Sequence, residues 1–152
     1  MTESPTRETN KAIVARWWTE YWGELNPDIV DELAADDLRW YYPLAGKVRG
    51  REAVKKRIIG YGERFPEGGF ELTDELIAEG DRVVARWEGG GTHTGRAWEL
   101  PVGTLPAASG ETAQYSGTTV FTVRDGEITE EHGQADYLGV MQQLGLVEPR
   151  RD

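Results

Sequence analysis

The sequence contains no cysteine and only two histidines, His93 and His132. The absence of cysteine excludes disulfide scaffolds, thiol nucleophiles and thiolate zinc sites. A transition-metal site would need both histidines together with carboxylates, and their separation matches none of the usual histidine motifs. We therefore expect no metal site and no thiol chemistry.

The chain also lacks an excess of basic residues and any long apolar segment. It has 27 Asp and Glu against 17 Lys and Arg, a formal net charge of −10. This charge disfavours attraction to nucleic acid or to anionic membranes. No run approaches the roughly 18 apolar residues of a transmembrane helix, and the N-terminus lacks the apolar core of a signal peptide. We expect a cytoplasmic protein that binds neither nucleic acid nor membrane.

The first third of the sequence has helical periodicity. From Thr9 to about Gly23, apolar residues recur at steps of three and four, which is typical of a helix with one buried face. A short second helix is predicted over residues 29–33, and a third from Arg51 to about Tyr61. Between the second and third helices, residues 38–43 alternate as in a strand.

The remainder of the sequence is rich in strand patterns. Five β-like runs are separated by Gly-rich or Asp-Gly turns, at residues 70–78, 82–88, 96–100, 114–124 and 127–137. Three helices followed by antiparallel strands predict one α+β domain, with the helices packed on one face of a curved sheet. We place this domain at residues 10–147 and expect flexible termini at 1–9 and 148–152.

The last strand carries polar side chains at alternate positions. With regular alternation, one face holds Ile128, Glu130, His132, Gln134 and Asp136. This face is either solvent-exposed or lines a polar pocket, and the small residues opposite it favour the pocket. A carboxylate buried in such a pocket has a raised pKa and can shuttle protons. Asp136 is therefore our candidate acid/base.

The two histidines are candidates to assist that chemistry. An imidazole can donate a hydrogen bond to a carbonyl or to a developing enolate. We group His93 and His132 with Asp136 as candidate catalytic residues. A structural or surface role is an equal alternative for each histidine.

The sequence is rich in large aromatic residues, with six Trp and six Tyr. Such side chains fill cores and interfaces or line cavities. Our candidates for substrate binding include Gln134 on the polar strand face and two residues that could close the pocket mouth, Trp17 and Tyr21. The candidate pocket walls are Trp40, Tyr42, Trp87 and Tyr115.

Several segments, taken in order, resemble the SnoaL-like polyketide cyclases of the nuclear transport factor 2-like superfamily. The resemblance spans about residues 10–147 and rests on residues 50–53, 64–66, 91–95, 118–128, 136–139 and 142–145. It implies a cone-shaped α+β barrel, in which the helices pack on a strongly curved antiparallel or mixed sheet.

The resemblance also implies an activity. Members of the family catalyse a cofactor-free aldol ring closure of a polyketide ester, with an acid/base at the position of Asp136 and substrate contact at the position of His93. A homo-oligomer, either a dimer or a tetramer, is implied as well. Residues 98–110 depart from the family pattern, so we expect a small hydrophobic carbonyl substrate without naming it.

Other functions remain open. The pocket could instead serve a hydrolase or hydratase resembling the limonene epoxide hydrolases of the same superfamily, with Asp136 and either Arg86 or Glu130 activating water, or an isomerase. The chain could also be a non-catalytic module for small-molecule binding or dimerisation. A deep cavity with Asp136 at its floor would favour an enzyme, and a filled or shallow one would favour the binding module.

Overall fold

The computed structural model describes residues 5–148, so the expected flexible termini lie partly outside the described residues. In chain order, the elements are α1 (Pro5–Trp17), the π-helix η1 (Trp18–Gly23), α2 (Ile29–Leu33), β1 (Ala34–Tyr42), β2 (Gly46–Arg49), α3 (Arg51–Arg64), β3 (Gly69–Leu72), β4 (Ile77–Glu79), β5 (Arg82–Thr92), β6 (Trp98–Leu100), β7 (Gly103–Leu105), β8 (Thr112–Arg124), β9 (Glu127–Ala135) and α4 (Tyr137–Gln143).

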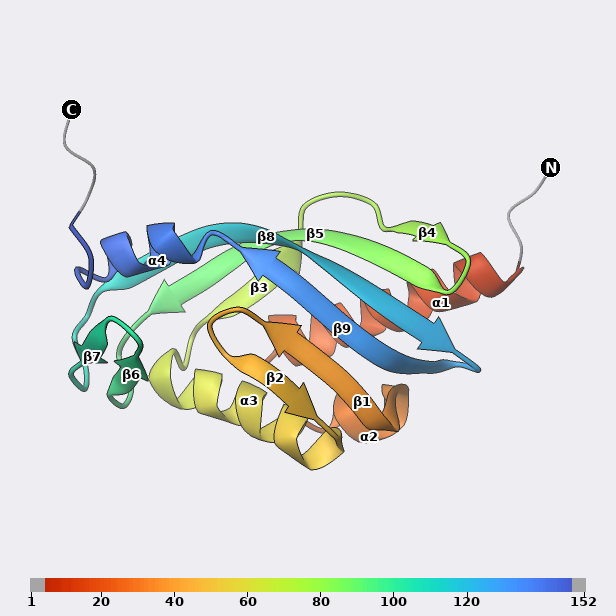
Figure 1. The fold of residues 1–152 in the computed structure, drawn as a ribbon, viewed down its shortest axis with the longest axis horizontal. Helices are drawn as coiled ribbons and strands as arrows, with labels where there is room; N and C mark the ends of the chain where they lie inside the picture. The colour runs from red at the N-terminus through yellow and green to blue at the C-terminus, as the bar shows by residue number, and fades with distance from the viewer. Residues whose placement is uncertain (1–4, 149–152) are drawn as a thin grey trace.

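Seven strands form one curled sheet, with α1, α2 and α3 on the same side of it (Figure 1). The strand order is β2-β1-β9-β8-β5-β3, and β4 also pairs with β5. The sheet is mixed, because β1 and β9 are parallel whereas the other paired strands are antiparallel. The predicted α+β class and curved sheet are confirmed.

The concave face of the sheet forms the core. Along β5, Val83, Ala85 and Trp87 are buried, and the alternate residues Arg86 and Glu88 are exposed. Side chains on a strand point alternately to opposite faces, so this pattern directs the apolar set toward the helices. The convex face carries the polar set.

The boundaries of several elements differ from the sequence-based expectation. The first helix begins at Pro5 rather than near Thr9, and its last turn is a π-helix. The run predicted at 70–78 is two strands, β3 and β4, which pair with different parts of β5. The short strands β2 and β7 were not predicted, because each has only three or four residues and is defined by its pairing partner.

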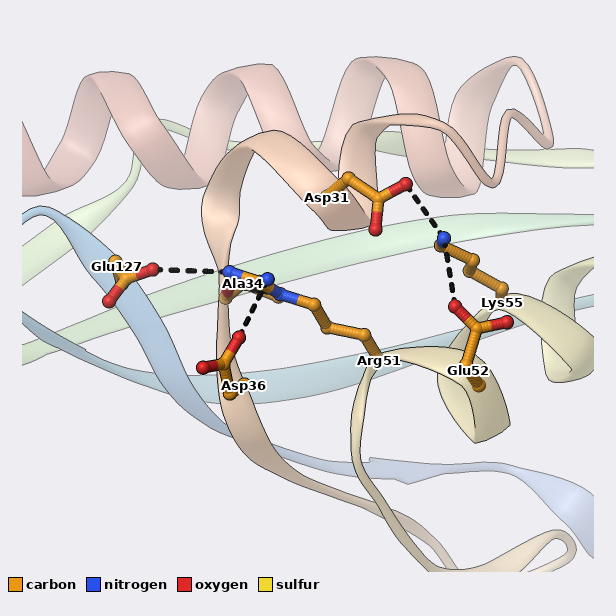
Figure 2. Close-up of polar contacts among 7 residues, drawn as sticks. All are labelled: Asp31, Ala34, Asp36, Arg51, Glu52, Lys55 and Glu127. Atoms are coloured by element: carbon orange, nitrogen blue, oxygen red, sulfur yellow. Dashed lines mark hydrogen bonds and ion pairs between the residues drawn. The ribbon is translucent and has the colours of Figure 1, made fainter.

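Charged side chains fix the start of α3 to the sheet (Figure 2). Arg51 donates to the carbonyl of Ala34 from Nε at 2.9 Å and from a terminal nitrogen at 2.7 Å, and it also pairs with Glu127 at 3.4 Å. One turn later, Lys55 pairs with Asp31 at 2.7 Å. The N-terminal end of α3 is thereby joined to α2, β1 and β9. Its C-terminal end lies beside the β6–β7 hairpin, where the cavity described below is found.

Candidate active site

Among the described residues, Glu131 of β9 is the one acidic side chain that is fully buried. It accepts three hydrogen bonds. Trp17 Nε1 donates to Oε1 at 2.9 Å, Trp22 Nε1 donates to Oε2 at 2.8 Å, and the Tyr42 hydroxyl donates to Oε2 at 2.6 Å. Every partner is a hydrogen-bond donor, which suits an ionised carboxylate.

Burial raises the pKa of Glu131 to about 7, although the hydrogen bonds from Tyr42, Trp22 and Trp17 act in the opposite direction. Desolvation disfavours the charged form of a carboxylate, and here it outweighs the three donors. A carboxylate with this pKa exchanges a proton readily near neutral pH. Glu131 therefore has the property that the sequence analysis expected of Asp136.

A β-bulge turns Glu131 into the core. In the pairing of β9 with β8, Glu130 lies opposite Thr122 and Ile128 lies opposite Val123, so Thr129 is an extra residue. The pairing of β9 with β1 shifts at the same place. Such a bulge changes the phase of the strand. Ile128 points inward before it, and Glu131 points inward after it.

A second irregularity brings two tryptophans to the same carboxylate. Trp17 and Trp22 are five residues apart, and in an α-helix of about 3.6 residues per turn such residues point in different directions. The π-helix η1 has wider turns, with Glu24 N bonded to Thr19 O at 3.0 Å. Residues five apart thus lie on one side of the helix, and both indoles reach Glu131.

Hydrogen bonds extend from Glu131 to the neighbouring strands. Trp87 Nε1 donates to Thr119 Oγ1 at 3.0 Å, and Thr119 Oγ1 lies 2.9 Å from the Tyr42 hydroxyl oxygen. An indole N–H can only donate, so Thr119 Oγ1 accepts from Trp87. The Thr119 hydroxyl can then donate its own proton to the Tyr42 oxygen, and the Tyr42 hydroxyl donates to Glu131. Burial, followed by the nearby Glu131, raises the pKa of Tyr42 well above its ordinary value. Tyr42 is therefore a protonated group in the resting site.

Tyr42 also lines an aromatic cavity. Its volume is about 200 Å³, and a smaller hollow of about 20 Å³ lies deeper, between the same rings. Trp22 and Tyr42 line both spaces. The cavity is also lined by Trp40, Tyr61, Phe70, Trp98, Tyr115 and Tyr137. The two donors to Glu131 Oε2 thus connect a buried carboxylate to the cavity wall.

Two further donors of the cavity wall have no acceptor. Trp40 Nε1 and the Tyr61 hydroxyl are buried and make no hydrogen bond. An unpaired buried donor carries the cost of its desolvation, on the order of 1–3 kcal/mol. Both would gain an acceptor from an oxygen atom of a bound molecule.

The four predicted wall residues line the cavity or the small hollow beside it, and their binding of substrate stays a prediction. Trp40, Tyr42 and Tyr115 line the cavity, and Trp87 lines the deeper hollow. The expectation for the mouth is wrong, because Trp17 and Tyr21 are fully buried in the core. Trp17 is held by Glu131, as described above, and Tyr21 donates to the carbonyl of Val54 at 2.9 Å.

The predicted polar face of β9 lies outside the cavity. Beyond the bulge, His132, Gln134 and Asp136 are exposed, and His132 contacts Tyr41 on the convex face. Asp136 caps α4, with its Oδ1 accepting from the Gly139 amide at 3.0 Å. The expected location of these side chains is wrong, because the bulge turns His132 and Gln134 to the opposite face and Asp136 lies past the end of β9. The catalytic roles assigned to Asp136 and His132 stay predictions.

His93 is fully buried, but both of its ring nitrogens are engaged. Nε2 lies 2.6 Å from the carbonyl of Arg96 and must donate to it, whereas Nδ1 accepts from the Ser109 amide at 3.3 Å. These bonds close the base of the loop that carries the β6–β7 hairpin. The Phe65 ring contacts both His93 and Trp98, and Trp98 lines the cavity; contact of His93 with substrate stays a prediction.

The residues considered for an epoxide hydrolase site do not meet. Arg86 pairs with Asp74 at 3.2 Å, and Glu130 pairs with Arg39 at 3.2 Å. Asp136 is engaged by the α4 cap. Each residue has a separate partner, so they form no common water-activating site.

A sequence profile of the SnoaL-like polyketide cyclase family matches residues 12–144. The chain belongs to this family. The SnoaL-like fold is also found in solved structures. One is from Jannaschia sp. CCS1 and bears the provisional name SnoaL-like polyketide cyclase; it has 25% identity, a TM-score of 0.80 and 99% coverage of each chain.

Two more structures with provisional polyketide cyclase names are similar. The structure from Acidithiobacillus ferrooxidans has 26% identity and a TM-score of 0.71, covering 95% of this chain and 98% of its own. IdmH from Streptomyces antibioticus has 20% identity and a TM-score of 0.72, and the match covers 90% of this chain and 98% of IdmH. No curated protein matches the chain.

For this SnoaL-like chain, sequence reasoning missed Glu131 and Trp22. Regular alternation placed Glu131 on the face opposite Asp136, together with Gly133 and Ala135. The available signal was the small size of those neighbours. A Cβ atom at Gly133 would lie 1.9 Å from Tyr42 Cε1, so this strand face has to pack against an aromatic ring.

Residues 5–148 contain no group of three or more His, Cys, Asp or Glu side chains that could hold a metal ion. No helix in this described range is long and apolar enough to cross a membrane.

Proposed function

We propose that this chain is a cofactor-independent cyclase that closes a ring by an intramolecular aldol reaction in the aromatic cavity. The observation that supports this proposal is the fully buried Glu131, with a pKa of about 7, joined through the 2.6 Å bond from Tyr42 to the cavity wall. The substrate is a small organic molecule with two carbonyl groups. Membership of the SnoaL-like family favours polyketide-type chemistry.

The proposed reaction begins with removal of a proton α to a carbonyl. The Tyr42 oxygen takes this proton while the hydroxyl proton of Tyr42 passes to Glu131. A phenol of high pKa is a poor acid alone, and the neighbouring carboxylate assists its proton transfer. Glu131 acts through Tyr42 and is therefore a positioning and proton-accepting residue, because it does not line the cavity itself.

The enolate then forms the new carbon–carbon bond. Trp40 Nε1 and the Tyr61 hydroxyl, both unpaired, are donors for the enolate oxygen. Donors already oriented toward developing negative charge stabilise it strongly in a site that excludes water. The enolate carbon attacks the second carbonyl, the resulting alkoxide takes a proton from Tyr42, and Glu131 returns the proton to Tyr42. No proton is gained or lost overall.

The test separates proton removal from ring closure. Aromatic polyketides bearing a β-keto ester side chain are incubated with the protein in deuterium oxide. Deuterium incorporation at the α-carbon is followed by NMR, and cyclised product by chromatography. We expect protein-dependent exchange that is lost in Tyr42→Phe. Binding in a thermal-shift assay without exchange or cyclisation would contradict the proposal and favour the non-catalytic binding module.

The homo-oligomer implied by the family resemblance is part of the same proposal. Light scattering coupled to gel filtration would test it, with a dimer or tetramer expected and a monomer as the contradicting result.

A further inference from the structure

A basic hollow adjoins the aromatic cavity. It has a volume of about 460 Å³ and lies over β2, α3 and the loop before β6. No acidic side chain lines it, although the chain as a whole has a net charge of −10. Its six cationic residues are Lys47, Arg49, Lys56, Arg57, Arg64 and Arg96.

Little of this positive charge is neutralised by the protein. Arg96 pairs with Glu63 at 3.1 Å, and Arg49 reaches Asp37 only at 4.0 Å with both side chains largely exposed. Within residues 5–148, the other four cations form no ion pair. Exposed pairs such as these contribute little to stability. The lining of the hollow therefore carries an excess of positive charge.

The pKa of the Arg64 guanidinium is lowered in this environment. Burial lowers its pKa below the ordinary value, and repulsion from Arg96 and Arg57 lowers it further, whereas the nearby Glu63 acts in the opposite direction. Its Nε is buried without an acceptor, while its guanidinium lies 5.8 Å from the centre of the Trp98 ring. A bound anion would supply the missing acceptor and offset the repulsion among the three arginines.

The hollow and the cavity share two residues. Arg57 and Arg64 line both spaces. On the cavity side, Trp40 is 4% exposed and its buried indole N–H has no partner. One molecule could therefore place an apolar ring among the aromatic side chains and a charged group among the cations.

We infer that the substrate of the cavity is an organic anion, whose carboxylate or phosphate group is held by Arg57 and Arg64 at the edge of the basic hollow. The inference rests on the proposed function, because it assumes that the cavity holds the substrate. Arginine suits either group, since its guanidinium can donate two parallel hydrogen bonds to a carboxylate or a phosphate. The charge would also fix which end of the substrate faces Tyr42.

Calorimetric titration with matched bicyclic probes tests this inference. 2-Naphthoate and 2-naphthyl phosphate carry the charged group, and 2-naphthamide is the neutral counterpart of the carboxylate. We expect the carboxylate to bind about tenfold more tightly than the amide. This difference should shrink in Arg57→Gln and nearly disappear when Arg64→Gln is added.

The control variant is Arg82→Gln, which removes one exposed positive charge at the start of β5 from a residue that lines neither the hollow nor the cavity. It should leave the preference for the carboxylate unchanged. Circular dichroism and a thermal melt of each variant confirm that it is folded. Because Arg57 is exposed, its single substitution remains informative even if Arg64→Gln does not fold.

Three results would overturn the inference. Equal affinity for carboxylate and amide, with cyclisation of neutral β-keto esters intact, would refute the anionic substrate and leave the proposed function standing. Binding of neither probe, together with no turnover, would refute both. Inorganic phosphate that binds as tightly as the naphthyl probes would show a separate anion site instead of a substrate group.

Discussion

The two faces of β9 differ in chemistry although their side chains alternate along one strand. Glu131 on the inner face is fully buried, accepts three hydrogen bonds and has a pKa of about 7. His132 and Asp136 are exposed, the former on the outer face and the latter where the strand ends. Burial, and not residue type alone, makes a carboxylate useful for proton transfer near neutral pH. Four experiments address this contrast.

The largest expected difference is in turnover. Glu131→Gln or Tyr42→Phe should reduce the rate by roughly 10²- to 10⁴-fold, the usual contribution of general acid/base catalysis. Asp136→Asn should retain most of the activity, because Asp136 lies outside the cavity. Rates measured over a range of pH should rise through an apparent pKa near 7 in the wild type and in Asp136→Asn. A rate loss confined to Asp136→Asn would restore the role that the family resemblance implies.

The second difference is in the pH dependence of stability. The native pKa of Glu131 is raised from 4.5 to about 7, so the folded state holds a proton that the unfolded chain releases in this interval. The contribution of Glu131 to the free energy of unfolding should therefore fall by about 3 kcal/mol as the pH rises from 4.5 to above 7.

Urea unfolding at pH 5 and pH 8 measures this effect. The change between the two pH values should be smaller in Glu131→Gln than in the wild type, and Asp136→Asn should follow the wild type. Equal pH dependence in all three proteins would mean that Glu131 does not have a raised pKa.

The third difference concerns packing on the two faces. Gly133→Ala introduces a Cβ within 1.9 Å of the Tyr42 ring and should destabilise the protein by about 1–3 kcal/mol, as overpacking usually does. Gln134→Ala, at the next position on the exposed face, should change stability by about 0.5 kcal/mol or less. Thermal melts of both variants compare the faces directly, and similar melting temperatures would argue against the close packing of Tyr42.

The smallest expected effect is at the end of the strand. Asp136→Ala removes the cap of α4 and should cost about 1 kcal/mol. Asp136→Asn retains an acceptor oxygen and should cost less. If both variants unfold at the wild-type denaturant concentration, the bond to Gly139 contributes nothing to stability.

Much of the fold could be predicted because its signals are local. The periodicity of α1, the strand alternation of β5 and β8 and the Asp-Gly turn before β9 are all visible in the sequence. The aromatic walls Trp40, Tyr42, Trp87 and Tyr115 could also be predicted, since alternation is regular from Leu38 to Tyr42 in β1 and at the starts of β5 and β8.

The buried carboxylate Glu131 could not be predicted in the same way. Its place depends on one extra residue, Thr129, in the pairing of β9 with β8, and pairing between distant segments leaves no periodic signal in either one. The contribution of Trp22 depends on a π-helical turn, which sequence periodicity does not distinguish from an α-helical one. Alternation therefore singled out Asp136, which lies just beyond the end of β9, whereas the buried carboxylate of the strand is Glu131.

The bulge at Thr129 also affects how relatives of this chain should be compared. Counting backward from the conspicuous Asp136-Tyr137-Leu138-Gly139 segment identifies an inward position only if each relative keeps the same extra residue. A homologue without it would present a different residue to Tyr42 at the same alignment column. Alignments of the family should therefore be anchored on strand pairing, and a one-residue gap in β9 should be treated as a change of the residue that faces the core.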